Sequence, residues 1–186
     1  MSPGRSIYQL KITLRDIKPP VWRRVQVLGS SSLAELHTVI QAAFGWWDYH
    51  LHEFEIGGMR YGIDDGEGWE PPDDERRAKL GKVVPPDATF TYLYDFGDDW
   101  EHSIKVEKVV PAEPNMTYPI CLGGKRARPP EDCGGPGGYA EFLEAISDPK
   151  HREHASMLEW VGGSFDPEQF DPGDFEHNLK MGPVLE

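Results

Sequence analysis

The stretch "SSSLAELHTVIQAAFG", from Ser30 to Gly45, decides the fold because it is the clearest helix in the chain. Ser32 and Glu35 have the spacing of a capping box, and Gly45 stands where a C-terminal cap belongs. His37 lies near the edge of the apolar stripe, so we expect a half-exposed structural histidine there. The stripe repeats at helical spacing and needs a second layer to cover it; it consists of Leu33, Leu36, Val39, Ile40, Ala43 and Phe44.

Strand patterns lie on both sides of this helix. "IYQLKITL" (residues 7–14) alternates apolar and polar residues, and "VWRRVQV" (residues 21–27) does the same except that Arg23 interrupts its apolar face. "HLHEFEIGGMRYG" (residues 50–62) predicts a hairpin with a Gly-Gly turn, in which His50 and His52 share the face of the apolar residues. Two more strands are expected over "ATFTYLYDF" (residues 88–96) and "WEHSIKVEKVV" (residues 100–110).

The end of the chain predicts helices. "YAEFLEAI" and "HREHASMLEWVG" have helical spacing, and "DPEQF" places Asp166 as a cap with Pro167 at the first helical position. Residues 111–138 are expected to form a long irregular loop. We therefore predict one α+β domain over residues 1–186, with an antiparallel sheet packed on one main helix, a grasp-like core, and additional C-terminal helices from about residue 139.

Composition restricts the function. The 186 residues carry a net charge of −13, with 20 Gly and 17 Pro, and a surface this acidic repels nucleic-acid phosphates. A local basic patch on the first two strands is the exception; it comprises Arg5, Lys11, Arg15, Lys18, Arg23 and Arg24. No stretch has the length of a membrane helix and no signal peptide is seen, so a cytoplasmic protein without a membrane partner is expected.

The stretch "YDFGDDWEH", Tyr94 to His102, concentrates acids, aromatics and one histidine. With a three-residue turn at Gly97–Asp99, Asp95 would face Glu101, and the two like charges would repel each other. With a two-residue turn, Asp95 would face His102 instead. One interpretation is a polar hairpin with a hydrogen-bonded core histidine; the other is a pocket or a metal site.

A second stretch, "CLGGKRARPPEDCGG", leads to a cleft hypothesis. We predict that the hairpin tip forms one wall of a cleft and "PPEDCGG" another, with some hairpin acids bound by glycine-loop amides or by Arg126 or Arg128. His102 should be semi-buried, and His102→Ala should cost about 1–3 kcal/mol. The candidate cleft residues are Tyr94, Asp95, Asp98, Trp100, Glu101, His102, Glu131 and Asp132.

No cofactor is clearly indicated, but zinc or another divalent metal is one hypothesis. His52, His102, Cys121 and Cys133 form a two-histidine, two-cysteine set that could bind zinc if the fold brought them together. Eleven residues separate the cysteines, unlike the short spacing of common zinc hooks. Two small buried cysteines are the other interpretation, and catalytic residues remain unassigned.

Several motifs, in order, resemble the plasmid pRi ORF-three-like family, which includes insertion-element passenger proteins with a TnpR, or resolvase, label. The resemblance spans about Ile7 to Leu179 and implies a compact α+β domain. Family members often have a cysteine just before "PPED", where this chain has Arg128, so a metal using that cysteine would lose a ligand here. The motifs are "YQLKITLRDIKPPVWRRVQV", "LHTVIQAAFGWWDYHLHEF", "YDFGDDWEH", "PPEDCGGPGGYAEFLEAI" and "FDPEQFD".

The leading functional interpretation is a non-enzymatic binding module for a protein or small-molecule ligand, associated with plasmids or mobile elements. Aromatic residues could line its groove, namely Trp46, Trp47, Tyr49, Trp69 and Trp100. A metal-dependent hydrolase around Asp95, Asp98 and His102 is the first alternative. A DNA-associated mobile-element protein is the second, although the chain shows no recombinase constellation and nucleic acid is disfavoured by its charge.

Overall fold

The computed structural model describes residues 6–64, 66 and 70–181, and it has the predicted α+β fold. One mixed, mostly antiparallel sheet has the strand order β5-β4-β3-β6-β7-β1-β2-β8, and its β4–β5 pair is parallel. The strands are β1 (Ser6–Leu14), β2 (Trp22–Leu28), β3 (His52–Ile56), β4 (Met59–Gly62), β5 (Asp73–Asp74), β6 (Thr89–Tyr94), β7 (Trp100–Pro111) and β8 (Ile120–Lys125). The helices are α1 (Leu33–Phe44), α2 (Leu80–Val83), α3 (Gly135–Ser147), α4 (His154–Trp160) and α5 (Gly173–Met181).

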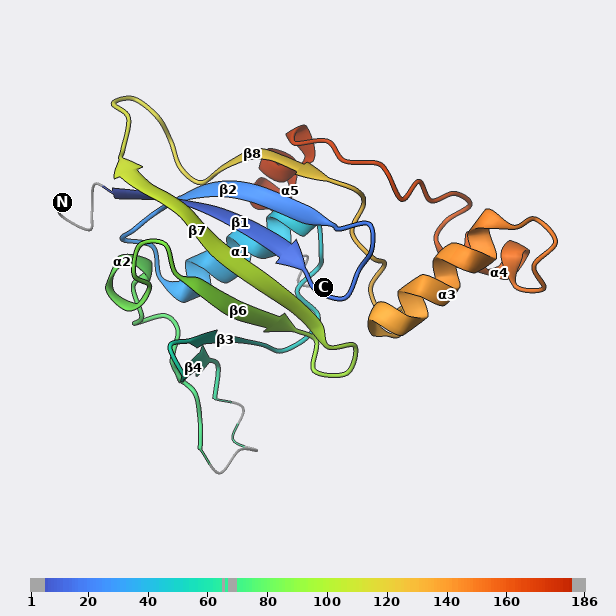
Figure 1. Ribbon diagram of the computed structural model, residues 1–186, viewed down its shortest axis with the longest axis horizontal. Helices are drawn as coiled ribbons and strands as arrows, with labels where there is room; N and C mark the ends of the chain where they lie inside the picture. Colours follow the sequence, from blue (N-terminus) through green and yellow to red (C-terminus); the bar gives the residue numbers. More distant parts are fainter. Residues whose placement is uncertain (1–5, 65, 67–69, 182–186) are drawn as a thin grey trace.

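Helix α1 begins and ends as its sequence predicts. The Ser32 amide donates to the Glu35 carboxylate at 2.6 Å, and the Glu35 amide donates to Ser32 Oγ at 3.1 Å, so the capping box is complete. Gly45 ends the helix at φ 76°, a left-handed conformation that glycine adopts without strain. The apolar stripe of α1 lies against one face of the sheet, and α5 packs beside α1 near β8 (Figure 1).

Two expectations about the loops and the C-terminal region were wrong, and one C-terminal helix was not predicted. Residues 111–138 contain β8, which pairs with β2 at the edge of the sheet. Residues 166–170 form a turn rather than a helix, in which Asp166 Oδ1 accepts from the Glu168 amide at 2.9 Å. Helix α5 was not predicted, because only Phe175 of that helix is buried and its apolar pattern is weak.

Arg23 explains the polar interruption in the β2 pattern. Its side chain points inward and is only 3% exposed. The guanidinium donates to the carbonyl oxygens of Ala43 at 2.8 Å and Lys125 at 3.1 Å, and it lies over the Phe44 and Phe170 rings at 4.9 and 4.4 Å. Burial lowers its pKa to about 10, so the group stays charged at neutral pH. Arg23 therefore joins α1, β8 and the C-terminal turn.

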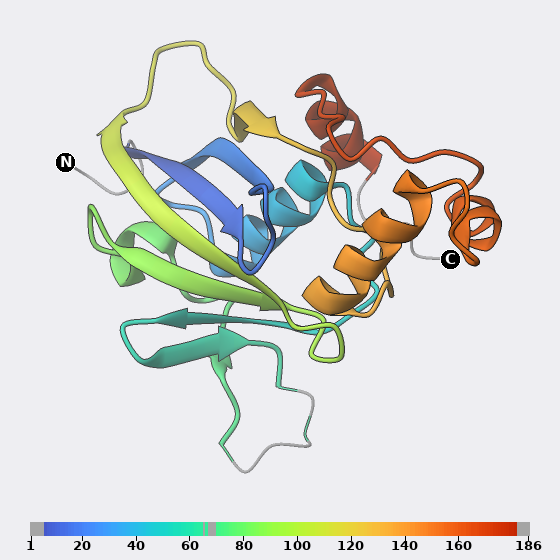
Figure 2. The same cartoon turned by 45° about the vertical axis from the view of Figure 1, so that its right-hand side comes forward.

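Helix α3 lies beyond one end of the sheet, next to the β6–β7 turn, and α4 packs against α3 farther from the sheet (Figures 1 and 2). Residues of α3 join the same core cluster as the strands, notably Tyr139 and Phe142. Helix α3 starts at Gly135, four residues before the expected start, and Pro136 occupies its first turn. This placement brings the glycine-rich loop before α3 to the tip of the β6–β7 hairpin.

Candidate functional site

The β6–β7 hairpin is closed by the loop Asp95–Asp99, which is longer than either predicted turn. Tyr94 pairs with Trp100 and Tyr92 pairs with His102. The Asp99 amide donates to the Asp95 carbonyl at 2.7 Å, and Asp95 Oδ1 accepts from the Gly97 and Asp98 amides at 2.9 and 3.3 Å. Asp95 is buried and has φ 60°. Both predicted registers were therefore wrong, because the Asp95 carboxylate folds back to satisfy the loop amides.

The carboxylates of the hairpin do not repel one another as expected. Leu93, rather than Asp95, lies opposite Glu101, and Glu101 pairs with Arg15. Asp98 Oδ2 accepts from the Gly134 amide at 3.1 Å. The prediction that a glycine-loop amide would bind a hairpin acid is confirmed for Asp98.

The two arginines predicted as donors lie elsewhere. Arg126 pairs with Glu168 at 2.7 Å, and Arg128 donates to the Gly45 carbonyl at 2.9 Å. Neither guanidinium forms an ion pair with a hairpin acid among the described residues. Arg128 instead binds the residue that caps α1, and Arg126 binds the C-terminal turn through Glu168.

His50 lies at the centre of a cluster of carboxylates that we call the His50 cluster: His50, Asp95, Glu131 and Asp132. His50 Nε2 is 3.1 Å from Asp132 Oδ1, 3.5 Å from Asp95 Oδ2 and 3.9 Å from Glu131 Oε2. The predicted hairpin and "PPEDCGG" walls thus meet around a histidine that was expected to lie on the β3 face. His50 precedes β3, so strand alternation does not set its direction.

Glu131 is held in the His50 cluster by two donors. Its Oε1 accepts from the Trp47 amide at 2.8 Å, and Tyr94 Oη donates to its Oε2 at 3.4 Å. Burial raises the pKa of the Glu131 carboxyl, and it also raises the pKa of Tyr94. The loop before α3 is therefore fixed to the segment after α1 through Glu131.

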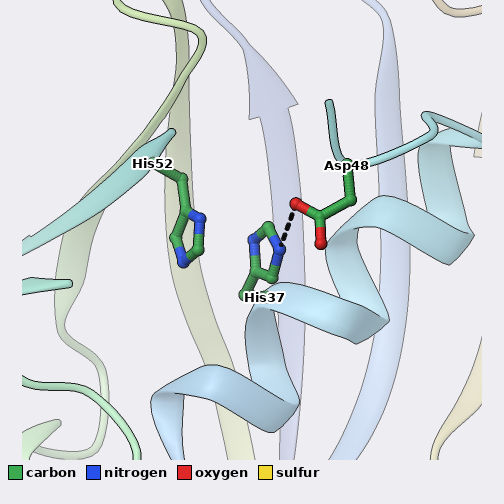
Figure 3. Close-up of side chains that lie close together, drawn as sticks. All are labelled: His37, Asp48 and His52. Carbon is green, nitrogen blue, oxygen red and sulfur yellow. Dashed lines mark hydrogen bonds and ion pairs between the residues drawn. The ribbon is translucent and has the colours of Figure 1, made fainter. Parts of the chain in front are cut away.

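A second group lies deeper, where the rings of His37 and His52 are stacked with centroids 3.5 Å apart and planes 7° apart (Figure 3). His37 Nε2 is 2.8 Å from Asp48 Oδ1, and His52 Nε2 is 2.8 Å from Glu75 Oε2. Burial is the main cause of the lowered pKa of His37. His37 is 6% exposed, so the expectation of a half-exposed histidine was wrong.

His102 and Trp100 belong to the core rather than to a cleft. His102 is fully buried, its Nδ1 lies 3.2 Å from the Tyr92 carbonyl oxygen, and its ring contacts Phe44 and Trp46 edge-on at centroid distances of 4.9 and 5.2 Å. Burial lowers the pKa of His102 to about 3. The prediction of a semi-buried His102 was wrong, because its face of β7 lies directly beneath α1.

The four candidate zinc ligands do not come together. Within the described residues, two groups of three or more His, Cys, Asp and Glu side chains have ligand atoms within 4.8 Å of one another. These groups are His37, Asp48 and His52, and His50, Asp95 and Asp132. His102, Cys121 and Cys133 belong to neither group, and both cysteines are free. Burial raises the pKa of Cys133 to about 12, which disfavours the thiolate that binds metals.

The predicted aromatic groove residues separate into two sets. Trp46 and Trp100 are buried, whereas Trp47 and Tyr49 are 44% and 64% exposed. Trp69 lies outside the described residues. A hollow that the sequence did not indicate lies near the hairpin tip, and its lining includes Leu51, Ile63, Phe96, Glu53, Asp64 and Glu70.

The described arginines of the basic patch on the first two strands are paired or buried, whereas Lys11 and Lys18 have no ion pair among the described residues. Arg24 pairs with Glu107 at 2.7 Å, Arg15 pairs with Glu101, and Arg23 is buried. Lys11 lies over the Trp22 ring, and Arg5 lies outside the described residues. These strands therefore offer little unpaired positive charge for a phosphate backbone.

Sequence reasoning gave no site role to four residues of the two clusters, namely His37, Asp48, His50 and Glu75. Asp48 has φ 59°, which turns the chain after α1 and brings the following residues toward the hairpin tip. The "DYHLH" stretch (residues 48–52) was the available sequence signal for Asp48 and His50, because polar and apolar residues alternate in it shortly after the helix cap at Gly45. Glu75 had no such signal, since it lies in a run of charged residues.

Comparisons with known proteins agree with this fold. A family model described as "Plasmid pRiA4b ORF-3-like protein" matches residues 6–174. An uncharacterized protein, y4hQ, from Sinorhizobium fredii is 47% identical over 161 residues, which cover 86% of this chain and 82% of that protein. The crystal structure of MM3350 from Methanosarcina mazei Go1, a protein of unknown function, has a TM-score of 0.85 and 41% identity, and it covers 91% of this chain and 97% of that one.

Proposed function

Because this chain belongs to the plasmid pRiA4b ORF-3-like family, whose matched relatives have no stated activity, we propose from its own surface that it is a non-enzymatic binding module. Its ligand is a polypeptide segment that carries both apolar and cationic side chains. The single observation that carries this proposal is the hollow beside the hairpin tip, which we call the Phe96 hollow. Its lining includes Leu51, Ile63 and Phe96 together with Glu53, Asp64 and Glu70.

The apolar part of the Phe96 hollow is exposed. Leu51, Ile63 and Phe96 are 43%, 56% and 49% exposed, and they come from three separate parts of the chain. The Asp95 amide donates to the Leu51 carbonyl at 2.9 Å, which holds the hairpin tip beside the segment before β3. Apolar side chains gathered around a hollow favour a partner that covers them.

The charges around the Phe96 hollow select the partner. Glu53, Asp64 and Glu70 contribute three carboxylates, whereas Arg60 is the one basic side chain among the lining residues described. Arg60 pairs with Glu53 at 3.1 Å, which leaves the carboxylates of Asp64 and Glu70 without an ion-pair partner among the described residues. A lysine- or arginine-containing segment complements this surface, and a nucleic-acid backbone does not.

The proposal also includes the cellular compartment of the protein. None of the helices in the described residues combines the length and apolar character that crossing a membrane requires. Cys121 and Cys133 are free thiols, which suits a reducing compartment. We propose a cytoplasmic location, which these thiols support.

The hydrolase and DNA alternatives have less support. The proposed hydrolase used Asp95, Asp98 and His102, but His102 is buried under α1 and faces aromatic rings instead of the hairpin loop. The DNA alternative lacks a free basic surface on the first strands. Neither alternative has an observation equal to the Phe96 hollow.

Fluorescence anisotropy tests the binding proposal directly. The probes are short fluorescein-labelled peptides in which leucine alternates with lysine, and matched peptides in which glutamate replaces lysine. We expect the lysine peptide to bind, with an affinity that falls as salt rises. Phe96→Ala and Leu51→Ser should each weaken binding about tenfold, the effect of losing one well-packed contact.

Leu122→Ser is the matched control, because Leu122 is 48% exposed on β8. It should bind the lysine peptide as the parent does. Equal binding of the glutamate peptide would contradict the proposal, as would unchanged binding by both Phe96→Ala and Leu51→Ser.

A further inference from the structure

We propose that the His50 cluster binds one divalent transition-metal ion, Zn²⁺ or Mn²⁺, through His50 Nε2 and the carboxylates of Asp95 and Asp132, with Glu131 as a nearby carboxylate that adds negative charge. This site is separate from the Phe96 hollow and does not depend on peptide binding.

The first argument is the arrangement of atoms around the imidazole nitrogen. His50 Nε2 lies 3.1 Å from Asp132 Oδ1 and 3.5 Å from Asp95 Oδ2. A metal bound at about 2.0–2.2 Å to nitrogen and oxygen holds adjacent ligand atoms about 3–3.5 Å apart. The two observed nitrogen–oxygen distances are therefore those of neighbouring ligands around one ion.

The second argument is that this nitrogen has no hydrogen-bond partner among the described residues. The His50 side chain is 26% exposed, but its Nε2 atom is buried and makes no hydrogen bond with that part of the chain. A distance of 3.1 Å permits a hydrogen bond, so Asp132 Oδ1 must lie to the side of the axis along which Nε2 points. With that oxygen beside the axis, the axis itself is left for an ion, and a buried nitrogen without a partner is costly otherwise.

The third argument is that the carboxylates are already oriented by other groups. Asp95 Oδ1 accepts from the Gly97 and Asp98 amides, so its Oδ2 is directed at His50. Glu131 accepts from the Trp47 amide and from Tyr94 Oη. Metal ligands are usually fixed in this way by partners behind them.

The fourth argument is the uncompensated charge. Asp95 and Glu131 have side chains only 9% and 12% exposed, and within the described residues their sole ion-pair partner is His50. Arg128 lies near enough to influence Glu131, but its guanidinium donates to the Gly45 and Pro129 carbonyls. A divalent ion would balance carboxylates that a single histidine cannot balance.

The ligand types select the class of ion. Imidazole nitrogen favours Zn²⁺ and other transition metals, and carboxylates also suit Mn²⁺. Mg²⁺ and Ca²⁺ prefer oxygen ligands alone, so they fit this set less well. Asp132 is 69% exposed, which makes it the ligand best able to move onto an ion.

The His37, Asp48 and His52 group is a weaker candidate for the same ion. A metal lies in the plane of each imidazole that binds it, whereas these two rings are parallel and stacked 3.5 Å apart. Their Nε2 atoms also have carboxylate partners already, Asp48 for His37 and Glu75 for His52. Substitutions in each group therefore show which of the two groups binds the ion.

Isothermal titration calorimetry tests the proposal. Untagged full-length protein is stripped with EDTA, transferred to chelator-free buffer and titrated with ZnCl₂ and with MnCl₂. We expect one ion per chain for at least one metal. His50→Ala and Asp132→Asn should each weaken binding at least tenfold, while His177→Ala, an exposed histidine on α5, should bind as the parent does.

His37→Gln reports on the stacked pair and should also bind as the parent does. Circular dichroism verifies that each variant is folded, and Asp132→Asn alters an exposed side chain that the fold does not need. Absence of binding of both metals by the parent overturns the proposal. So does parent-like binding by Asp132→Asn and His50→Ala, or a loss confined to His37→Gln.

Discussion

The imidazoles of His37 and His52 are stacked face to face, with centroids 3.5 Å apart, although one comes from α1 and the other from β3. Each ring has its own carboxylate partner, Asp48 for His37 and Glu75 for His52. If both rings were protonated, two positive charges would lie in contact inside the protein. The neighbouring ring therefore limits the protonation of His37.

The titration of His37 tests this limit. Burial and the neighbouring His52 ring both lower the pKa of His37. We expect long-range ¹H–¹⁵N NMR spectra to show a His37 ring that titrates below 6.5, the ordinary value. In His52→Gln the neighbouring charge is gone, so the pKa of His37 should rise. A His37 pKa that stays the same or falls in this variant would show that the stacked ring has no electrostatic effect.

His102 should stabilise the fold through packing. Its ring is fully buried against Phe44, Trp46 and Tyr92. We expect His102→Ala to lower the free energy of unfolding by about 2–5 kcal/mol, the usual range for emptying a core position. Equilibrium urea denaturation measures this. An unchanged denaturation midpoint would mean that the ring does not pack as described.

The same residue predicts a pH dependence. The folded-state pKa of His102 is lowered to about 3, against 6.5 for the free side chain. Between these pH values the unfolded chain binds a proton at this residue that the folded protein does not bind. The free energy of unfolding therefore falls as pH falls, by up to about 1.4 kcal/mol per pH unit. Above pH 6.5 both states are neutral at this residue, and it has no effect.

His102→Gln isolates that contribution. This variant should be less stable than the parent at pH 7, but it should lose less stability between pH 6.5 and pH 4.5, because glutamine does not titrate. Urea midpoints at several pH values give both curves. Parallel curves for parent and variant would show that His102 is protonated in the folded protein.

Arg23 and Arg24 are neighbours that should behave differently. Arg23 is buried and its guanidinium donates to three carbonyl oxygens, those of Trp22, Ala43 and Lys125. Arg23→Ala should cost about 3–5 kcal/mol, since it leaves buried acceptors without a donor and opens space beside two phenylalanine rings. Arg24 makes a partly exposed pair with Glu107, so Arg24→Ala should cost about 1 kcal/mol or less. Thermal and urea denaturation compare the two, and equal losses would contradict this account.

Two glycines of α3 test the contact between its first turn and the hairpin tip. Gly135 has φ 67°, and a Cβ there would lie 2.3 Å from the Asp98 carbonyl oxygen. Gly135→Ala should therefore cost more than about 2 kcal/mol. A Cβ at Gly137 would meet nothing within 4 Å, so Gly137→Ala should be neutral or stabilising by up to about 1 kcal/mol. If Gly135→Ala were as stable as Gly137→Ala, the hairpin tip would not pack on this loop.

The sequence determined the main elements of the fold. Capping residues and the 3.6-residue apolar period placed α1 between Ser32 and Gly45, and alternation placed β1, β2, β6 and β7. These signals are local, because they depend on residues a few positions apart along the chain. The Gly57–Gly58 turn of the β3–β4 hairpin was predictable for the same reason, since both residues have positive φ.

The partners of the polar residues were decided by the tertiary structure. Asp95 was predicted in a cleft, but its meeting with His50 and Asp132 depends on three segments far apart in the sequence. The stacking of His37 on His52 depends on how α1 lies across β3. Periodicity shows which face of a strand or helix is buried, but it does not show which residue of another element lies opposite. That second property is set when the elements pack, so the local sequence could not determine it.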